Sequence, residues 1–310
     1  MKPNPLRQIA ALALLFICPA LFAAGTFRVA AYNVENYLDE VTASRHNVKS
    51  AEAKAKIRET IKTMNPDVIS LEEMGETNAL LELRDSLKKD GIDFPYWEHI
   101  TAYDTNIHVA VLSKFPFTAR RPHTNDDFLL AGKRFSVKRG FAEVDVQVSS
   151  NFTFTLLAAH LKSKLASPQA DEEEQRLEEA KILREKIDDR LKLDPDANLV
   201  ILGDLNDTPD SKPIKQVVGT GKAKLVDTRP AERNGDSLPN STNPNWAPRN
   251  VAWTHYFGKE DTYSRIDYIL LSHGMAKHLV KAETYIPVIP NWGIGSDHRP
   301  VLATFTTEKN

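Results

Sequence analysis

Short apolar runs alternate with amphipathic segments along most of the chain. In residues 26–33, Phe27, Val29 and Ala31 recur at every second position, the period of a strand with one buried face. The alternation in 141–148, followed by a turn and a second alternating run, predicts a β-hairpin. The expected strands span residues 26–33, 67–71, 107–112, 141–148, 152–159, 199–202, 266–271 and 301–305.

Three segments have the periodicity of helices: 47–64, 76–89 and 171–192. The last is the strongest, and the acidic run at its start suits the positive end of the helix dipole. The inward-facing positions that we expect are Ala51, Ala55, Ile57 and Ile61 in the first helix, and Leu177, Ala180, Leu183, Ile187 and Leu191 in the third.

Two long segments lack such a pattern. Residues 114–139 are basic and loop-like, and residues 228–264 are rich in Pro, Asn and aromatic side chains, including Trp246 and Trp253. A loop as long as the second is usually functional or disordered, and a self-packed aromatic loop is an equally good interpretation. Strands outnumber helices, and a hairpin is mixed with helical crossovers. The pattern therefore predicts a layered α/β domain whose sheets are not purely parallel.

The first residues have the layout of a secretory signal peptide. Lys2 and Arg7 precede a nearly continuous apolar run over 9–24, and small residues follow at 23–25. A membrane anchor is the rival interpretation, but the run is shorter than the ~20 residues of a spanning helix and Pro19 interrupts it. We expect a signal peptide over 1–25, a domain over 26–310, and an exported protein, periplasmic or secreted, without a stable membrane anchor.

Composition limits the possible partners and the means of stabilisation. The chain has 310 residues with 40 Lys+Arg and 42 Asp+Glu, a net charge of -2, which becomes -4 (38 minus 42) without Lys2 and Arg7. An acidic balance argues against indiscriminate coating of nucleic acid but leaves room for a local basic groove. The single cysteine, Cys18, lies in the leader, so the domain must rely on its core rather than on disulfides. We expect a monomer.

A polar cluster follows the apolar run 199–202. Asp204, Asn206 and Asp207 come within five residues after it, and Pro209 prevents the strand from continuing. Carboxylate and amide oxygens at a strand end are suited to a hard cation or a phosphate. The same residues also form Asx turns for conformational reasons. Taken alone, the segment leaves the two interpretations even, with Asp207 more simply a turn residue.

Similar polar residues follow other predicted strands. Each has a structural alternative: Asn33 as a cap or turn residue, His160 as a core histidine, and Glu72 or Glu73 as outward-facing, since neighbours in a strand point to opposite faces. Asp267, between apolar neighbours, needs a partner if it is buried. Convergence of these strand ends would create an oxygen-rich site for Mg²⁺, Mn²⁺ or Ca²⁺. The set is Asn33, Glu73, His160, Asp204, Asn206, Asp267, Asp297 and His298.

The order of these motifs resembles the endonuclease/exonuclease/phosphatase superfamily of deoxyribonucleases, abasic-site endonucleases, sphingomyelinases and inositol-phosphate phosphatases. The likeness extends from Asn33 to Pro300, and the Gly-Asp-x-Asn and Ser-Asp-His elements are the most specific. It implies an α/β (α+β) four-layer sandwich, two mixed β-sheets packed face to face with helices on the outside. The matching segments are 33–36, 69–73, 159–163, 203–207, 265–268 and 295–301.

The resemblance also implies roles for individual residues. Glu73 would be the principal metal ligand, with Asn33 and Asp297 close by, although Glu72 stands where the family often has Gln. The substrate side would be formed by Asp204 and Asn206, which hold the attacking water, a second metal or the phosphoryl oxygens. The remaining assignments are Asp267 as the residue that orients His298, His160 as the second histidine found in deoxyribonucleases and sphingomyelinases, and Arg139 as a phosphate contact.

The expected activity is metal-assisted hydrolysis of phosphate esters with Mg²⁺, or with Mn²⁺ or Ca²⁺ as alternatives. His298 or Asp204 would take a proton from water and His160 would donate one. A phosphodiester substrate such as DNA or RNA is favoured by the basic segment 114–139 and by the aromatics of 246–257. A phosphatase and a lipid phosphodiesterase stay as alternatives, although no clear apolar hairpin is visible. A non-catalytic binding protein is disfavoured because the site residues are intact.

Overall fold

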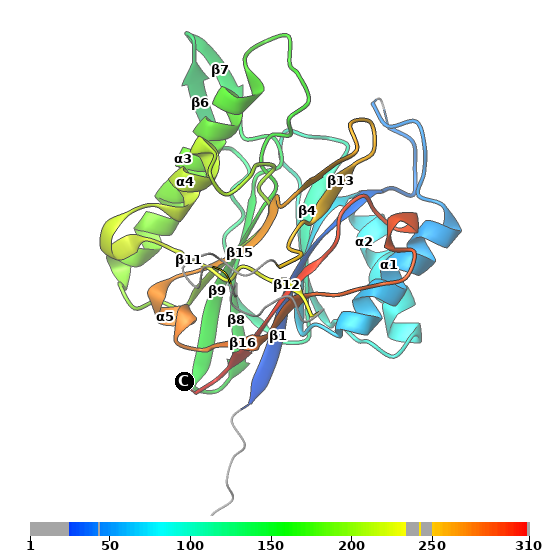
Figure 1. Cartoon of the computed structure of the whole chain (residues 1–310), viewed down its shortest axis with the longest axis vertical. Helices are drawn as coiled ribbons and strands as arrows, with labels where there is room; N and C mark the ends of the chain where they lie inside the picture. Colours follow the sequence, from blue (N-terminus) through cyan, green and yellow to red (C-terminus); the bar gives the residue numbers. More distant parts are fainter. Residues whose placement is uncertain (1–24, 43, 234–241, 243–249, 309–310) are drawn as a thin grey trace, which may run out of the picture.

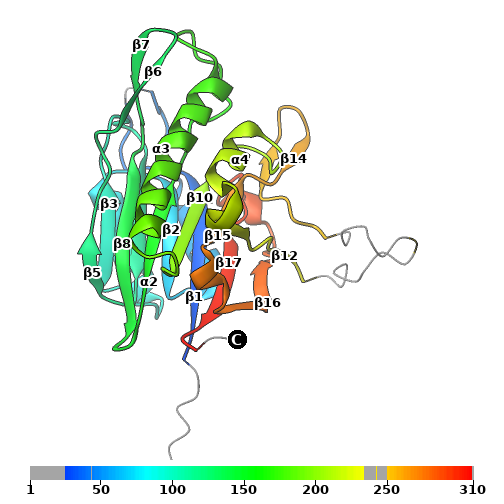
Figure 2. The same cartoon turned by 90° about the vertical axis from the view of Figure 1, so that its left-hand side faces the viewer.

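The computed structural model describes residues 25–42, 44–233, 242 and 250–308. Two large sheets face each other between two layers of helices (Figures 1 and 2). The first sheet contains β1 (Thr26–Tyr37), β2 (Val68–Met74), β3 (Tyr96–Ile100), β4 (His108–Ser113), β12 (Ala231–Glu232), β16 (Leu279–Ile286) and β17 (Val301–Thr306). The second contains β5 (Phe117–Arg120), β8 (Phe141–Ser149), β9 (Phe152–Ala159), β10 (Leu199–Asp204), β11 (Val226–Asp227) and β15 (Asp267–Leu271).

The helices are α1 (Ala51–Met64), α2 (Thr77–Lys89), α3 (Glu172–Leu193), α4 (Lys212–Val218) and α5 (His273–Ala276), with 3₁₀ turns η1 (Gly221–Ala223) and η2 (Trp292–Ile294). Two hairpins complete the described elements: β6 (Asp127–Leu130) with β7 (Lys133–Ser136), and β13 (His255–Phe257) with β14 (Thr262–Ser264).

Both sheets are mixed. The first has the order β12-β16-β17-β1-β2-β4-β3, and its central strand β1 runs parallel to β2 and antiparallel to β17. The second has the order β11-β15-β10-β9-β8-β5, and β10 runs parallel to β9 and antiparallel to β15. The prediction of sheets that are not purely parallel is confirmed.

Three apolar layers hold the elements together. Alternate residues of β1 serve two of them, because Val29 faces the second sheet while Ala30 faces the helices. The layer between the sheets also includes Leu156 and Leu202. Helices α1 and α2 cover the outer face of the first sheet, and α3 and α4 cover that of the second, where Leu183 packs. The four-layer sandwich is therefore confirmed (Figure 1).

Two predictions were wrong: the start of the first helix and the loop-like character of residues 114–139. Helix α1 begins at Ala51, where the Ser50 side chain caps it by accepting a hydrogen bond from the amide of Ala53. Ala51 and Ala55 are exposed, while Ile57 and Ile61 are buried as expected. The basic segment 114–139 is not a plain loop, because it contains the edge strand β5 and the β6–β7 hairpin. Four-residue strands offer too little alternation to be recognised.

The segment 228–264 also contains short strands, β12 to β14, that the sequence did not predict, and Trp246 lies outside the described residues. Strands β3, β11 and β16 were likewise missed. The expected signal peptide, apart from Gly25, falls outside the described residues. No helix in the described part of the chain is long and apolar enough to cross a membrane.

Candidate active site

One end of the sandwich collects the predicted polar residues. The loop after β1, the β13–β14 hairpin and the β6–β7 hairpin all project from the end opposite to the start of β1 (Figure 1). At this end the two sheets meet through side chains. Asn33 of β1 donates from Nδ2 to Asp204 Oδ2 of β10 at 2.9 Å, and the same nitrogen lies 3.4 Å from Glu73 Oε1. A single amide therefore joins the central strands of both sheets.

Irregular backbone brings Glu73 into the site. Its φ of 58° is in the left-handed region, and the pairing of β2 with β4 shifts between Leu71 and Met74. Asn36 donates its backbone N–H to Glu73 Oε2 at 3.0 Å. Strand β1 continues beyond Asn33 to Tyr37, so Asn33 lies within a strand whose register shifts and not at its end as we predicted.

Both glutamates of β2 lie close to the site, and one of them, Glu73, enters it. Glu72 is fully buried, and Ser70 Oγ donates a hydrogen bond to its Oε1. Burial, together with the negative charges of Asp267 and Asp204, raises the pKa of Glu72 to about 8 against the hydrogen bond from Ser70. The rule of opposite faces fails here because Glu73 is not extended. Glu72 lies beneath the site, while Glu73 reaches into it.

Asp204 occupies the centre. Its Oδ1 accepts the backbone N–H of Asn206 at 2.8 Å, and Asn206 donates from Nδ2 to Leu161 O at 3.0 Å. The preceding Gly203 has a φ of +124°, and a Cβ there would lie 2.1 Å from Ala159 O and 3.0 Å from Glu72 Oε1. Glycine is therefore required for β10 to pass this close to β9 and to Glu72.

Asp267 and His298 form a buried pair next to Asp204. Asp267 lies directly opposite Asp204 in the antiparallel pairing of β10 with β15. His298 Nδ1 is 3.0 Å from Asp267 Oδ2, and its Nε2 is 3.7 Å from Asp204 Oδ2. Burial lowers the pKa of His298, but the charges of Asp267 and Asp204 outweigh it and raise the pKa well above its ordinary value. Asp267 thus fixes the orientation of the ring, as the resemblance implies.

His160 approaches Asp204 separately. It follows β9, it is buried, and its Nε2 lies 3.6 Å from Asp204 Oδ2. Burial and the positive charge of Arg139 lower its pKa well below the ordinary value, so this histidine is neutral. The same carboxylate oxygen therefore has a neutral imidazole at 3.6 Å and a charged one at 3.7 Å.

Asp297 is partly exposed, with 42% of its side chain accessible. It has a neighbour that we did not predict, because His255 Nε2 lies 3.6 Å from Asp297 Oδ2 and the His255 ring lies 4.6 Å from that of His298. Burial acts to raise the pKa of Asp297, but His255 and His298 outweigh this effect and lower the pKa below its ordinary value. His255 is in a segment without strand periodicity, so no local pattern singled it out.

Arg139 lies at the side of the site. Its Nη1 donates to Leu161 O at 3.2 Å, the same oxygen that accepts from Asn206, and its Nε lies 3.3 Å from Asp104 Oδ2. Asp207, which we expected to be a turn residue only, is buried and pairs with Arg176 Nη2 at 2.9 Å. Its role is to attach the end of β10 to α3.

The structure joins all nine predicted residues in one network. Asp204 contacts or closely approaches four of them, and the others attach through those four or through the carbonyl of Leu161. In addition, Ser296 Oγ donates to Asn33 O at 2.7 Å, which holds the segment 296–298 against β1. The two sheets and three loops thus form one cluster of carboxylates, amides and imidazoles.

This cluster occurs in a chain whose sequence matches the family model "Endonuclease/Exonuclease/phosphatase family" over residues 30–298. The chain belongs to this family. Its members are divalent-metal-dependent hydrolases of phosphoester bonds, and the chain is accordingly a phosphoester hydrolase. A comparison with curated proteins found no match by sequence.

Solved structures confirm the fold of this family member. Beta toxin from Staphylococcus aureus, a double mutant with bound magnesium ions, has a TM-score of 0.61 at 18% identity, covering 90% of this chain and 99% of that one. Truncated Caenorhabditis elegans TDP2 has a TM-score of 0.58 at 16% identity, with coverages of 91% and 97%. Sphingomyelinase C from Streptomyces griseocarneus has a TM-score of 0.58 at 16% identity, with coverages of 91% and 99%.

The residues present fit a hard divalent cation. The donors of the site are mainly oxygens, with carboxylates from Glu73, Asp204, Asp267 and Asp297, and cysteine is absent from the described residues. Burial and, to a smaller extent, the charge of Asp267 raise the pKa of Asp204 to about 7 against the opposing charge of His298. Asp267 Oδ1 is buried without a hydrogen-bond partner among the described residues. Unbalanced negative charge and a free buried oxygen are what a cation would satisfy.

Proposed function

We propose that this family member is an exported, Mg²⁺-dependent phosphodiesterase whose substrate is nucleic acid. The observation that carries the proposal is the position of His160 and His298, whose Nε2 atoms lie 3.6 and 3.7 Å from one oxygen of Asp204. Two imidazoles in different protonation states around one carboxylate are suited to a displacement in which one proton is taken up and another is supplied.

The residues divide the work as follows. Glu73, Asn33 and Asp297 would hold the cation, which when bound stabilises negative charge on the phosphoryl oxygen. Asp204 and Asn206 orient the attacking water, with Asp204 as the proton acceptor, because its pKa of about 7 is near neutrality. His298, charged and oriented by Asp267, supplies the proton that the leaving oxygen takes up as its bond to phosphorus breaks. Neutral His160 donates a hydrogen bond to a phosphoryl oxygen.

The pKa directions change one detail of the expectation from the sequence. From the sequence, we expected either His298 or Asp204 to accept the proton from the attacking water. In the structure the pKa of His298 is raised well above its ordinary value, so its imidazole already holds a proton near neutral pH. Asp204 is consequently the better acceptor, and we assign it that role.

Mg²⁺ is the proposed ion because the oxygen donors suit it and because the similar beta toxin structure has bound magnesium ions. Nucleic acid is the proposed substrate because basic side chains surround Arg139 and aromatic rings lie near His298. Phe257 of β13 and Tyr263 of β14 are 38% and 55% exposed. Exposed rings next to a phosphodiester site are suited to stacking on bases.

The same hairpin favours a second candidate, a sphingomyelin-type lipid phosphodiesterase. The sequence shows no clear apolar hairpin, but β13 and β14 form a hairpin that carries two exposed aromatic rings, and the fold resembles that of sphingomyelinase C. Against this candidate, Tyr263 packs on Tyr256 at 4.7 Å and on Trp253 at 4.9 Å between ring centroids. Much of the aromatic surface is therefore engaged within the protein, as in the self-packed interpretation of this loop.

The test is hydrolysis by purified protein starting at residue 26. The substrates are bis-p-nitrophenyl phosphate, p-nitrophenyl phosphate, plasmid DNA, RNA and sphingomyelin, each with Mg²⁺, Mn²⁺, Ca²⁺ or EDTA. We expect Mg²⁺-dependent cleavage of the diester and of nucleic acid, and loss of activity in Asp204→Ala. Full activity in EDTA or in Asp204→Ala would refute the metal-dependent mechanism, and preference for sphingomyelin would select the second candidate.

Export is tested separately by expressing the full chain in a bacterium and determining the N-terminus of the product. A periplasmic or extracellular product beginning near residue 26 is expected. An intact N-terminus in the cytoplasm would refute export without affecting the proposed chemistry.

A further inference from the structure

A pocket of about 350 Å³ lies beside the site, and its lining is strongly basic. It carries four cationic side chains, those of Arg45, Lys138, Arg139 and Lys162, and one carboxylate, that of Asp104. Since the whole chain has a net charge of -2, this concentration of positive charge is local. The other polar residues of the lining are uncharged: Ser44, Tyr103, Thr105, Asn106, Ser163 and Ser167. Such a lining suits an anion with several oxygens.

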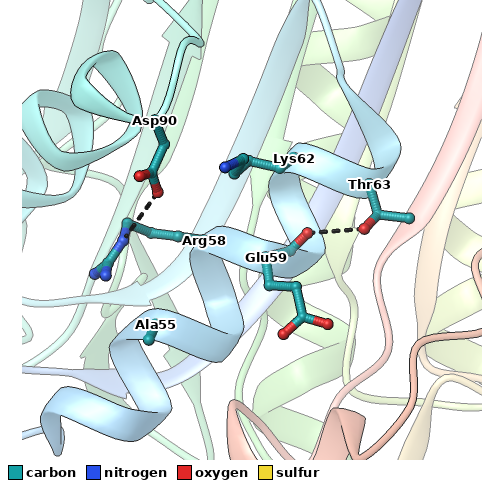
Figure 3. A pocket seen from close by; sticks show the side chains of 6 residues that line it. All are labelled: Ala55, Arg58, Glu59, Lys62, Thr63 and Asp90. Carbon is teal, nitrogen blue, oxygen red and sulfur yellow. Dashed lines mark hydrogen bonds and ion pairs between the residues drawn. The ribbon is translucent and has the colours of Figure 1, made fainter.

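Size does not distinguish this pocket from others, but charge does. The groove in Figure 3, on the outer side of α1, has a volume of about 430 Å³. Its two cations, Arg58 and Lys62, are balanced by Glu59 and Asp90, and Arg58 turns toward Asp90 at 3.4 Å. Arg58 pairs with Asp90 there, and the two cations are matched in number by two carboxylates, so no excess of positive charge is left for a ligand.

The basic pocket is joined to the catalytic cluster by direct contacts. Arg139 and Asn206 donate to the same oxygen, Leu161 O, at 3.2 and 3.0 Å. On the other side, Arg45 donates from Nε to Asn36 Oδ1 at 2.6 Å, and the backbone N–H of Asn36 donates to Glu73 Oε2. The pocket therefore adjoins both the proposed metal ligand and the residue proposed to orient water.

Contacts from α3 hold the wall of the pocket in place. The backbone N–H of Lys162 donates to Glu179 Oε2 at 2.6 Å, and Arg176 donates to Lys162 O at 3.0 Å. The Lys162 amine donates to the carbonyls of Ser163 and Leu165, both at 2.8 Å, so its charge is not neutralised by a carboxylate at these contacts. Burial and the charge of Arg139 lower the pKa of Lys162, as expected where cations repel each other.

We propose that this pocket binds a second phosphate of the substrate, next to the phosphate that is hydrolysed, so that the enzyme prefers substrates with at least two phosphates. The inference rests on the proposed function and specifies its substrate class. The second phosphate has two sources, the adjacent linkage or terminal phosphate of a nucleotide chain and a phosphomonoester on an inositol headgroup. Both offer the same kind of anionic phosphate oxygens to the four cations.

The test compares matched pairs of substrates that differ by one phosphate. Thymidylyl-thymidine is used with and without a terminal phosphate, and glycerophosphoinositol with and without a 4-phosphate. In Mg²⁺ we expect the added phosphate to raise kcat/KM at least tenfold in one or both pairs, mainly by lowering KM. A gain in the nucleotide pair alone assigns the pocket to nucleic acid, and a gain in the inositol pair alone assigns it to a headgroup.

Two variants locate the effect. Lys138→Ala, at an exposed position, and Arg45→Gln should reduce the gain to less than threefold, and the ratio within each variant cancels any general loss of activity. Lys62→Ala, from the neutral groove of Figure 3, is the matched control and should keep the wild-type gain. Equal kcat/KM for both members of each pair, or an undiminished gain in both pocket variants, would overturn the proposal alone. No hydrolysis of any diester would overturn the proposed function as well.

Discussion

Two buried carboxylates of the second sheet have opposite electrostatic environments. Glu143 of β8 is 2% exposed and lies 2.5 Å from Arg121 Nε, 2.6 Å from His123 Nε2 and 2.6 Å from Arg190 Nη2. Asp204 of β10 is 1% exposed, and the residue opposite it in the sheet is another acid, Asp267. Burial alone would raise the pKa of both. Cationic neighbours instead lower that of Glu143 to about 2, while that of Asp204 rises to about 7.

The difference separates a structural charge from a functional one. Glu143 has its counterions in the protein, so its charge is stabilised in the folded protein whether or not a ligand is bound. Asp204 is close to Asp267, and its cationic neighbour among the described residues is the imidazolium of His298, so part of its negative charge is left for a metal ion or a proton to neutralise. Burial by itself therefore does not identify an active-site acid, whereas burial without enough counterions does.

The largest expected effect is on catalysis. Asp204→Asn should lower kcat/KM for bis-p-nitrophenyl phosphate by about 10³-fold, the usual scale for a positioned acid–base group. Glu143→Gln should change the activity of the folded protein by less than about twofold, because it lies outside the connected cluster. Steady-state kinetics at saturating Mg²⁺ measures both. Comparable losses in the two variants would remove this distinction.

The second effect is on stability, and here the larger change is expected at Glu143. Glu143→Gln leaves Arg121 and Arg190, which are 27% and 29% exposed, without their buried carboxylate partner, and it should reduce the free energy of unfolding by about 2 to 3 kcal/mol at pH 7. Urea unfolding followed by circular dichroism measures this change. A stability equal to that of the wild-type protein would show that the cations around Glu143 find other partners.

A smaller effect depends on pH. Because the folded-state pKa of Asp204, about 7, lies above its ordinary value of 3.8, ionisation of Asp204 destabilises the metal-free fold as the pH rises through this range. Glu143 has the opposite shift, and its contribution is lost only as the pH falls from about 4.5 to about 2. In EDTA, the stability of Asp204→Asn relative to wild type should therefore increase by about 2 kcal/mol between pH 5 and pH 8.

Urea unfolding of Asp204→Asn and the wild-type protein at the two pH values tests this expectation, and Mg²⁺ should diminish the difference. A difference in stability that does not change between pH 5 and pH 8 would contradict the raised pKa of Asp204.

The smallest effect is expected at Glu72, and its neighbour Glu73 serves as the comparison. At pH 7 Glu72, with a pKa of about 8, is mostly protonated and resembles glutamine, so Glu72→Gln should change kcat/KM by less than about threefold. Glu73→Gln should lower it by at least about 100-fold, the low end for a group of this kind. The matched pair is compared on the same diester with a Mg²⁺ titration. A large loss in Glu72→Gln would mean that its charge, rather than its shape, is needed.

The sequence contained enough information for the layers and for the members of the cluster. Long alternating strands and polar residues at their ends are local patterns, and they led to Asp204, Asp267, His160 and His298. The details that depend on deviations from regular backbone were not accessible. Neither the positive φ of Glu73 nor the register shift of β1 beyond Asn33 follows from residue type, since both arise from pairing with strands distant in sequence.

Residues supplied by irregular segments were missed for a similar reason. His255 reaches Asp297 because the chain around it forms a single bridge with His298, a contact between segments that are far apart in the sequence. The ion pair of Asp207 with Arg176 likewise depends on where α3 lies. In both cases hydrophobic periodicity does not predict the contact, because the tertiary arrangement determines which residue is the partner.

The narrow space at Gly203 also has a practical consequence for engineering this enzyme. Every amino acid that could replace Gly203 brings a side-chain carbon to within 2.1 Å of Ala159 O, in a backbone conformation that L-residues rarely adopt. Among active clones from a random library, codon 203 should therefore show only synonymous changes. Diversity aimed at new substrates is better placed at position 138, where the side chain of Lys138 is exposed and lines the basic pocket.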